Sequence, residues 1–595
     1  MSPWLSLTAI ALVLALGVAA LRPAWRVLPR VDRLAGLALS GLFALSLLAT
    51  AGWSSLEHLE VSYLFEAIKP DSVGELVFGR QAAEQMHQPL FPMVLSGWAR
   101  VLWPALVGAT GTVASPLTES GTAWLRAPSA LFAAFGLLLV WSSVRRRHGR
   151  EAAWLAGAVV ALNPLVLWYG SDVSPYALLF FLGTVVTTSV WESFEERSSP
   201  AARSARIRAG VALAAAFYTH FHGAWLAIVV GLWLWPARPR ESDPHSSWRD
   251  RFRPLLQVTA TTALLCLPAI SLLFEKLVTS VQGLTEDQPM MRYSHALSEA
   301  IPDALRVLFG GESFGWTVVA ALAIWGAVRG EGPVRRLLVV AAIVAIAAEV
   351  HITWQLSVAK GIVYIDVRHY IYLVPVITEA LVALLRGQVG RRQVGRIAWV
   401  APLVAATTAL PIATGRLPKP AAAEAVTWVR EQASSPEHGI AYLPAPWYSG
   451  IIEVYLTGPC VGLVHGRSFE GWWSLETCAL SETPQAGSIY GFPFGADRLW
   501  TSRSRRGLRW LWLIDFRDHR FGLPVAPSVA QEGMACWPSL AAATVQTRHF
   551  GPWVTVMKLD LERLRAGSPP RPLATPPVRT VRAGDAWPIA CDDDP

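Results

Sequence analysis

The sequence has 595 residues, of which 53% are hydrophobic and only 16% charged, with a mean hydropathy of +0.37. Apolar runs of roughly 17–25 residues, long enough to cross a bilayer as helices, recur along the chain, which excludes one large soluble core. The net charge of +8 comes from arginines that are not gathered into one patch, so it does not indicate nucleic-acid binding. We predict a polytopic α-helical membrane protein.

In chain order, the apolar runs predict about twelve transmembrane helices. They lie near residues 4–21, 34–53, 124–144, 152–169, 176–193, 207–219, 223–236, 254–273, 314–328, 337–356, 369–385 and 396–414. Together they predict a transmembrane module over residues 1–414.

Arginine and lysine are distributed unequally between the two sets of connections. If odd-numbered spans run inward, one set holds 24 of these residues, counting Arg208 and Arg396 at its edges, and the opposite set holds 8. Basic connections stay in the cytoplasm, so the basic set is predicted to be cytoplasmic. It comprises 22–33, 145–151, 194–206, 237–253, 329–336 and 386–395. The irregular segments, including the first outward loop at 54–123, then face outward, and a bacterial cytoplasmic membrane is the expected location.

Residues 415–595 have mixed charge, short β-rich runs at 439–443 and 508–514, and a proline-rich tail. They predict an extracytoplasmic α/β domain. This domain contains four of the five cysteines: Cys460, Cys478, Cys536 and Cys591. An even number of cysteines outside the cytoplasm favours two disulfides over free buried thiols.

One carboxylate, Asp172, lies in a gap of six residues (170–175) between two predicted spans. The simple interpretation is a charge solvated at the membrane surface, which needs no function. The alternative is a functional carboxylate, held in place because so short a gap leaves little slack. The other motifs on the predicted outward side help to decide between a solvated charge and a functional carboxylate.

Six motifs follow one another on the predicted outward side. They are His58-Leu59-Glu60, His87-Gln88-Pro89-Leu90, Arg126-Ala127-Pro128-Ser129-Ala130, Asp172-Val173-Ser174-Pro175-Tyr176, a Tyr-Thr-His turn within 217–223, and an Arg-His-Tyr segment within 367–375. In this order the sequence resembles the GT-C superfamily of integral-membrane glycosyltransferases, especially the bacterial branch similar to protein O-mannosyltransferases and lipid A aminoarabinose transferases. The resemblance covers roughly residues 50–385. The chain departs from the family pattern at two positions: Glu60 lacks the second member of an acidic pair, and Ser174 replaces an arginine.

The resemblance implies an inverting glycosyltransferase that moves one sugar from a polyprenyl-phosphate donor in the bilayer to a hydroxyl acceptor outside. A hydroxyl nucleophile needs a positioned proton acceptor. Glu60 is the expected base, with Asp172 orienting the acceptor or sharing that role. The acceptor class stays open between glycan, lipid and protein.

The departing lipid phosphate gains negative charge, which fixed cations stabilise without a metal. Arg368, Lys360 and Arg126 are the candidates, although Lys360 and Arg126 fit equally well as interfacial anchors whose stems snorkel. Substrate-binding candidates are His58, His87, Tyr176, His220 and His222. A divalent metal held by His87, His220 and His222 with Glu60 and Asp172 is less favoured, because the histidine spacing matches no metal-binding pattern, and no cofactor is expected.

Three other functions remain as alternatives. About twelve spans also suit a transporter, but no similarity between two halves is visible and the charges lie at one surface. The incomplete acidic pair suits a GT-C-like binding or assembly component without catalysis. A polymerase or ligase that moves whole glycans is the third.

Overall fold

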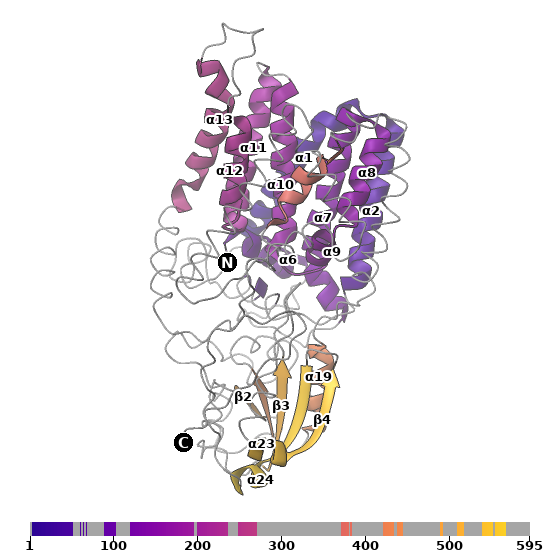
Figure 1. Cartoon of the computed structure of the whole chain (residues 1–595), viewed down its shortest axis with the longest axis vertical. Helices are drawn as coiled ribbons and strands as arrows, with labels where there is room; N and C mark the ends of the chain where they lie inside the picture. Colours follow the sequence, from indigo (N-terminus) through magenta and orange to yellow (C-terminus); the bar gives the residue numbers. More distant parts are fainter. Residues whose placement is uncertain are drawn as a thin grey trace. The chain divides into compact units, whose positions relative to one another are not determined.

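The computed structural model (Figure 1) shows a mostly helical chain with a small C-terminal sheet. It describes residues 3–51, 60, 63–64, 67, 88–102, 119–195, 199–235, 248–269, 370–379, 381–382, 421–433, 437–443, 488–491, 509–516, 538–550 and 554–566. The chain divides into two compact units. The first contains Met1–Ala51, Pro70–Val101 and Leu125–Arg416, and the second contains Gly52–Lys69, Leu102–Trp124 and Leu417–Pro595. The predicted domain boundary at 414/415 lies outside the described residues.

The first unit is a helical bundle that contains helices at the predicted spans that the structure describes. Its labelled helices are α1 (Pro3–Val27), α2 (Arg30–Ala51), α6 (Leu90–Leu102), α7 (Glu119–His148), α8 (Arg150–Ala161), α9 (Pro164–Gly170), α10 (Pro175–Glu195), α11 (Pro200–Thr219), α12 (Gly223–Leu234) and α13 (Trp248–Cys266), which continues into the short 3₁₀ helix η1 (Leu267–Ala269). Helix α6 lies within the predicted first loop, and the start of α7, up to Trp124, belongs to the second unit. Residues 373–379 form a further helical segment.

Within the part of the chain that the structure describes, four helices are long and apolar enough to cross a membrane. They are Ser6–Val27, Arg30–Ala49, Gly121–His148 and Pro175–Phe194. The helical membrane character is therefore confirmed. The count of twelve spans stays a prediction, because several of the later spans lie outside the described residues.

The predicted span 152–169 is two helices, α8 and α9, rather than one. Pro164 has no N–H to continue α8, and the Asn163 side-chain oxygen accepts hydrogen bonds from the backbone N–H groups of Leu165 (3.0 Å) and Val166 (3.4 Å). An asparagine cap followed by proline is a strong helix start. The new helix α9 leads directly into the gap that holds Asp172.

Glycines allow several helices of the bundle to approach closely. A Cβ added at Gly17 of α1 would lie 2.6 Å from the Phe135 ring of α7. At Gly183 of α10 it would lie 3.0 Å from Cβ of Tyr372. Because membrane helices gain little from the hydrophobic effect between themselves, such close packing is a main source of their association.

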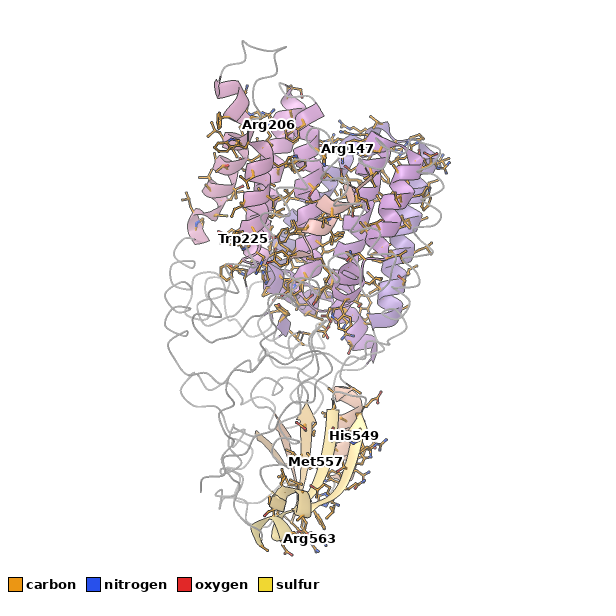
Figure 2. All side chains as sticks on the ribbon, viewed as in Figure 1. Arg147, Arg206, Trp225, His549, Met557 and Arg563 are labelled. Carbon is orange, nitrogen blue, oxygen red and sulfur yellow. The ribbon has the colours of Figure 1, made fainter. Side chains whose placement is uncertain are left out.

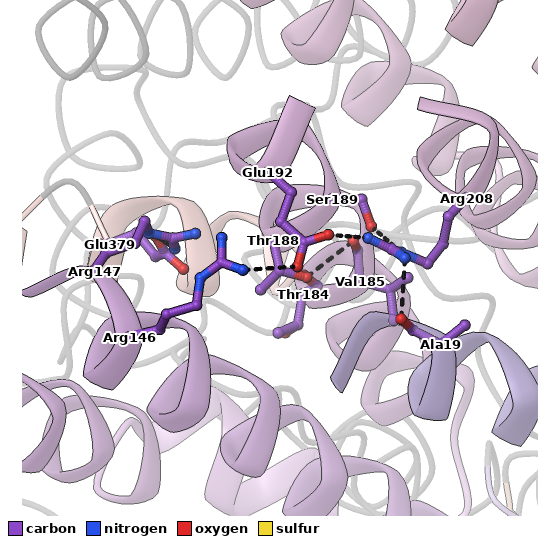
Figure 3. Close-up of polar contacts among 10 residues, drawn as sticks. All are labelled: Ala19, Arg146, Arg147, Thr184, Val185, Thr188, Ser189, Glu192, Arg208 and Glu379. Atoms are coloured by element: carbon purple, nitrogen blue, oxygen red, sulfur yellow. Dashed lines mark hydrogen bonds and ion pairs between the residues drawn. The ribbon is translucent and has the colours of Figure 1, made fainter. Parts of the chain in front are cut away.

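Three consecutive arginines at the end of α7 pair with acids on three different helices. Figure 3 shows two of these arginines, Arg146 and Arg147, with Glu192 and Glu379. Arg145 donates from Nε to Asp32 of α2 at 2.9 Å, and Arg146 lies 3.9 Å from Glu192 of α10. Arg147 pairs with Glu379 in the 373–379 segment and lies over the Trp191 ring. We call this end of the bundle the arginine end. In the sequence these arginines indicated only membrane orientation, whereas in the fold they also bind helices together.

Arg208, expected at the edge of a connection, lies inside α11 and is nearly buried. Its guanidinium pairs with Glu192 and donates hydrogen bonds to the Ser189 hydroxyl oxygen (2.8 Å) and to the carbonyl of Ala19 (3.0 Å). Figure 2 shows Arg147 and Arg206 at the arginine end, with Trp225 of α12 further towards the opposite end. Glu192 thus pairs with two arginines, Arg146 and Arg208.

The second unit contains a five-stranded sheet in the order β2-β1-β3-β5-β4. Strands β2 (Ser488–Gly491), β1 (His438–Leu443) and β3 (Trp510–Phe516) are parallel, while β5 (Val554–Asp560) and β4 (Thr544–Phe550) are antiparallel. The β-rich runs in the sequence are β1 and β3. The small α/β domain is therefore present, with helices α19 (Ala422–Gln432), α23 (Pro538–Ala543) and α24 (Leu561–Ala566).

Aromatic contacts join α19 to this sheet. The Trp428 ring lies 5.2 Å from Trp512 and 5.6 Å from Phe550 between ring centroids. The Trp512 indole N–H donates to Nδ1 of His438 at 3.0 Å, so this nitrogen carries no proton. Burial lowers the pKa of His438, and the nearby Lys558 ammonium lowers it further, which favours this neutral form.

The four cysteines of the predicted disulfides lie outside the described residues, so their pairing stays a prediction. Cys266, in α13 of the first unit, is a free thiol.

Candidate functional site

The structure places the predicted site residues in three groups. Arg126, Asp172, Tyr176, His220 and His222 belong to the first unit. Glu60 belongs to the second unit. His58, His87, Lys360 and Arg368 lie outside the described residues, so their roles stay predictions.

Asp172 lies in the connection between α9 and α10, at the end of the bundle opposite the arginine end. The Ser171 hydroxyl donates to the carbonyls of Leu167 (3.1 Å) and Trp168 (2.9 Å), and the N–H of Ser174 donates to the Asp172 carbonyl at 3.0 Å. Asp172 itself is only 4% exposed. It is therefore a buried carboxylate in a tight turn, and not the solvated surface charge of the simple interpretation.

A continuous series of aromatic and imidazole rings crosses this end of the bundle. It draws on α9, the start of α10, the turn between α11 and α12, and the segment that begins at 370. Successive ring centroids lie 4.8, 5.4, 5.2, 5.7 and 6.3 Å apart. We call it the ring chain, and its members in order are Tyr169, Tyr176, His220, His222, Tyr370 and Tyr372.

The ring chain contains three residues that sequence reasoning missed: Tyr169, Tyr370 and Tyr372. A usable signal existed for Tyr169, since it flanks the same short gap as Tyr176. Tyr370 and Tyr372 lie within the Arg-His-Tyr segment, in which the sequence analysis predicted a binding role for the arginine alone. The four tyrosines are buried. Phenols and imidazoles supply hydrogen-bond donors and acceptors, so these groups can bind oxygen-rich ligands.

The turn that carries His220 and His222 depends on Gly223. The N–H of Gly223 donates to the His220 carbonyl at 2.8 Å, which closes the turn at the start of α12. A Cβ added at Gly223 would lie 2.5 Å from backbone atoms of Ala216 and Phe217. Because backbone atoms cannot rotate away as a side chain can, only glycine fits here.

Gly223→Ala is expected to displace both histidines and to destabilise the protein by about 1–3 kcal/mol. Thermal unfolding in detergent would measure the loss. Gly231→Ala is the matched control in the same helix, since its added Cβ would meet only Leu255 Cδ1, at 3.9 Å. The control should be neutral or more stable by about 0.5–1 kcal/mol, as alanine is in helix interiors. Equal behaviour of the two variants would contradict the assigned role of Gly223.

Arg126 is fully buried, with no exposed surface. Its guanidinium donates a hydrogen bond to the carbonyl of Ala51, the last residue of α2. Three residues later, the Ser129 hydroxyl of α7 lies 3.5 Å from the carbonyl of Ser174. Arg126 therefore joins α7 to the end of α2 and is not a snorkelling anchor, while its role toward a donor phosphate stays a prediction.

Glu60 lies on a helical stripe in the second unit. Glu60, Tyr63, Leu64 and Ala67 are helical and buried, at the spacing of one helix face. Glu60 is 1% exposed, so it too is a buried carboxylate. Its expected pairing with Asp172 stays a prediction.

Within the described ranges, no three histidine, cysteine, aspartate or glutamate side chains come together in a way that could hold a metal ion. What the first unit does bring together is a buried carboxylate and two imidazoles that lie in series with four phenols. This set can orient a hydroxyl group and donate hydrogen bonds to oxygen atoms.

No protein-family model matches the sequence, and no curated protein matches it either. Among solved structures, ArnT from Cupriavidus metallidurans in the apo state is similar with a TM-score of 0.50 at 14% identity, over 90% of this chain and 98% of that chain. The chain has a GT-C fold. The resemblance seen in the motifs is thus confirmed at the level of the fold.

Two further GT-C structures are similar at lower scores. ArnT from the same organism bound to undecaprenyl phosphate gives a TM-score of 0.48 at 14% identity, over 88% of this chain and 97% of that chain. The Archaeoglobus fulgidus oligosaccharyltransferase in complex with Zn and sulfate gives 0.42 at 12% identity, over 80% of this chain and 67% of that chain.

One departure from the GT-C pattern has a structural counterpart. Ser174 takes the place of an arginine and is buried, and its hydroxyl has no hydrogen-bond partner in the described part of the chain. The turn at Asp172 therefore presents a small neutral side chain where the motif has a cation.

Proposed function

We propose that this protein is a membrane glycosyltransferase. It moves a single sugar from a polyprenyl-phosphate-linked donor to a hydroxyl acceptor on the extracytoplasmic face, with inversion at the anomeric carbon. The observation that carries the proposal is the buried Asp172 at the same end of a GT-C bundle as the ring chain. The donor class follows from the motif resemblance and from the ArnT-like fold, ArnT being a lipid A aminoarabinose transferase.

The reaction needs one proton acceptor and one stabilised leaving group. The acceptor hydroxyl attacks the anomeric carbon, and its proton passes to a carboxylate. The bond from that carbon to the phosphate oxygen breaks, and the electron pair stays on the polyprenyl phosphate that leaves. Glu60 receives the proton in this proposal, and Asp172 orients the hydroxyl. Burial of a carboxylate keeps competing water away from it, which suits both roles.

The phosphate that leaves gains negative charge, and nearby cations would lower the barrier to its departure. Arg368 and Lys360 are proposed for this role. Arg126 is a weaker candidate than the sequence indicated, because its guanidinium already serves the end of α2. Tyr176, His220 and His222 would bind the oxygens of the sugar or acceptor.

The test is transfer by the purified protein in liposomes that contain a panel of polyprenyl-phosphate sugars and extracted envelope acceptors. Release of free polyprenyl phosphate, together with a labelled product, is the expected result. Mass spectrometry of the envelope with and without the protein would identify the product. Uptake of a solute without donor cleavage would instead support the transporter alternative and contradict the proposal.

A second candidate is a GT-C-fold binding component without catalysis. The observations that favour it are the incomplete acidic pair at Glu60 and the serine at 174. Under this alternative the purified protein would retain a polyprenyl-phosphate sugar but neither hydrolyse nor transfer it, with every acceptor tested.

The proposed orientation predicts which segments face outward. In a cysteine-free background, Ser72→Cys and Thr285→Cys should react with an impermeant maleimide in intact cells, because both lie in predicted outward loops. Ser198→Cys, in a predicted cytoplasmic connection, should react only after the membrane is opened. The reverse labelling pattern would overturn the orientation.

A further inference from the structure

His220 is fixed by the turn in which it lies. Its N–H donates to the Ala216 carbonyl at 2.9 Å, and its carbonyl accepts from Gly223 at 2.8 Å. Its ring lies between those of Tyr176, at 5.4 Å, and His222, at 5.2 Å. Backbone and ring are therefore both held, so the ring nitrogens have defined environments.

One ring nitrogen is committed by a backbone contact. The N–H of His222 donates to Nδ1 of His220 at 3.2 Å. A nitrogen that accepts a hydrogen bond from an amide carries no proton, so the neutral imidazole carries its proton on Nε2. Protonating Nδ1 would place two N–H groups against each other and would remove this bond.

We propose that His220 binds substrate as a neutral hydrogen-bond donor through Nε2–H, and that it does not accept the proton of the acceptor hydroxyl. The inference rests on the proposed function and deepens it. Nδ1 is occupied by the His222 amide and Nε2 already carries a proton, so neither nitrogen is a base. The ligand atom is an oxygen of the sugar or of the phosphate, and proton transfer is left to the carboxylates.

Side-chain replacements can separate a donor from a base. The amide nitrogen of glutamine lies near the position of Nε2, whereas that of asparagine lies near Nδ1. His220→Gln should keep the donor and retain transfer within about tenfold of the wild type, whereas His220→Asn and His220→Ala should lose about 10²–10³ in rate, the effect of removing one preorganised donor. His549→Gln, in the sheet of the second unit, is the control and should transfer at the wild-type rate.

The tautomer can be measured without any activity. ¹⁵N spectra of imidazole-labelled protein, with the His220 signals assigned by their loss in His220→Gln, should show Nδ1 unprotonated and Nε2 protonated. A proton on Nδ1 in the wild-type protein would overturn the inference, even if a variant failed to fold.

The outcomes for this inference and for the proposed function differ. A wild-type protein that transfers sugar, together with a folded His220→Gln as inactive as His220→Ala, would overturn the donor role alone. A wild-type protein that neither cleaves nor transfers from any lipid-phosphate donor would overturn the proposed function.

Discussion

Asp172→Asn is expected to abolish sugar transfer, with a loss on the order of 10²–10⁴ in rate, while the protein stays folded and retains its polyprenyl-phosphate donor. Asparagine has the shape of aspartate, so it fits the tight turn after α9. It removes the negative charge and one acceptor oxygen from a side chain that is only 4% exposed. Glu60→Gln should have the same effect if the two carboxylates act together.

The control for this prediction is another buried aspartate in the same bundle. Asp32 is 4% exposed but lies at the arginine end, where it pairs with Arg145. Asp32→Asn should lower the stability of the protein. The transfer rate per folded molecule should stay at the wild-type value. Transfer at the wild-type rate by Asp172→Asn would show that the charge has no catalytic role.

Arg147→Ala is expected to destabilise the protein by about 3–5 kcal/mol, the cost of removing one member of a buried ion pair. Glu379 is 1% exposed and pairs with Arg147, which also packs over the Trp191 ring. The 373–379 segment begins just after Tyr370, so its displacement should also lower transfer. Thermal unfolding and transfer measured on the same preparation would check both effects.

Arg146→Ala is the matched control, one residue earlier in α7. Its partner Glu192 keeps a second arginine, Arg208, so no charge is left unpaired and the loss should be clearly smaller. The double variant Arg147→Ala with Glu379→Gln should recover part of the stability, because the buried negative charge is removed together with its arginine. Equal losses for the Arg146 and Arg147 variants would contradict this account of the arginine end.

The sequence by itself determined the features that depend on neighbouring residues. Apolar runs predicted helices over the described part of the bundle, because length and hydropathy are local properties that suit a membrane. The β-rich runs predicted strands β1 and β3, and the ordered motifs predicted the GT-C fold. The break at Asn163–Pro164 was equally local: its cap signal is in the sequence, but the single span predicted over 152–169 missed it.

Only the tertiary structure decided which residues meet and which are buried. Tyr370 reaches His222 across 148 positions of sequence, and Glu379 reaches Arg147 across 232. No periodicity encodes such pairs, because they depend on how the helices pack together. The burial of Asp172 was undetermined for the same reason: a short polar gap looks alike in sequence whether water or other helices surround it. The hydrogen bond from the His222 N–H to Nδ1 of His220 likewise forms only in the folded turn.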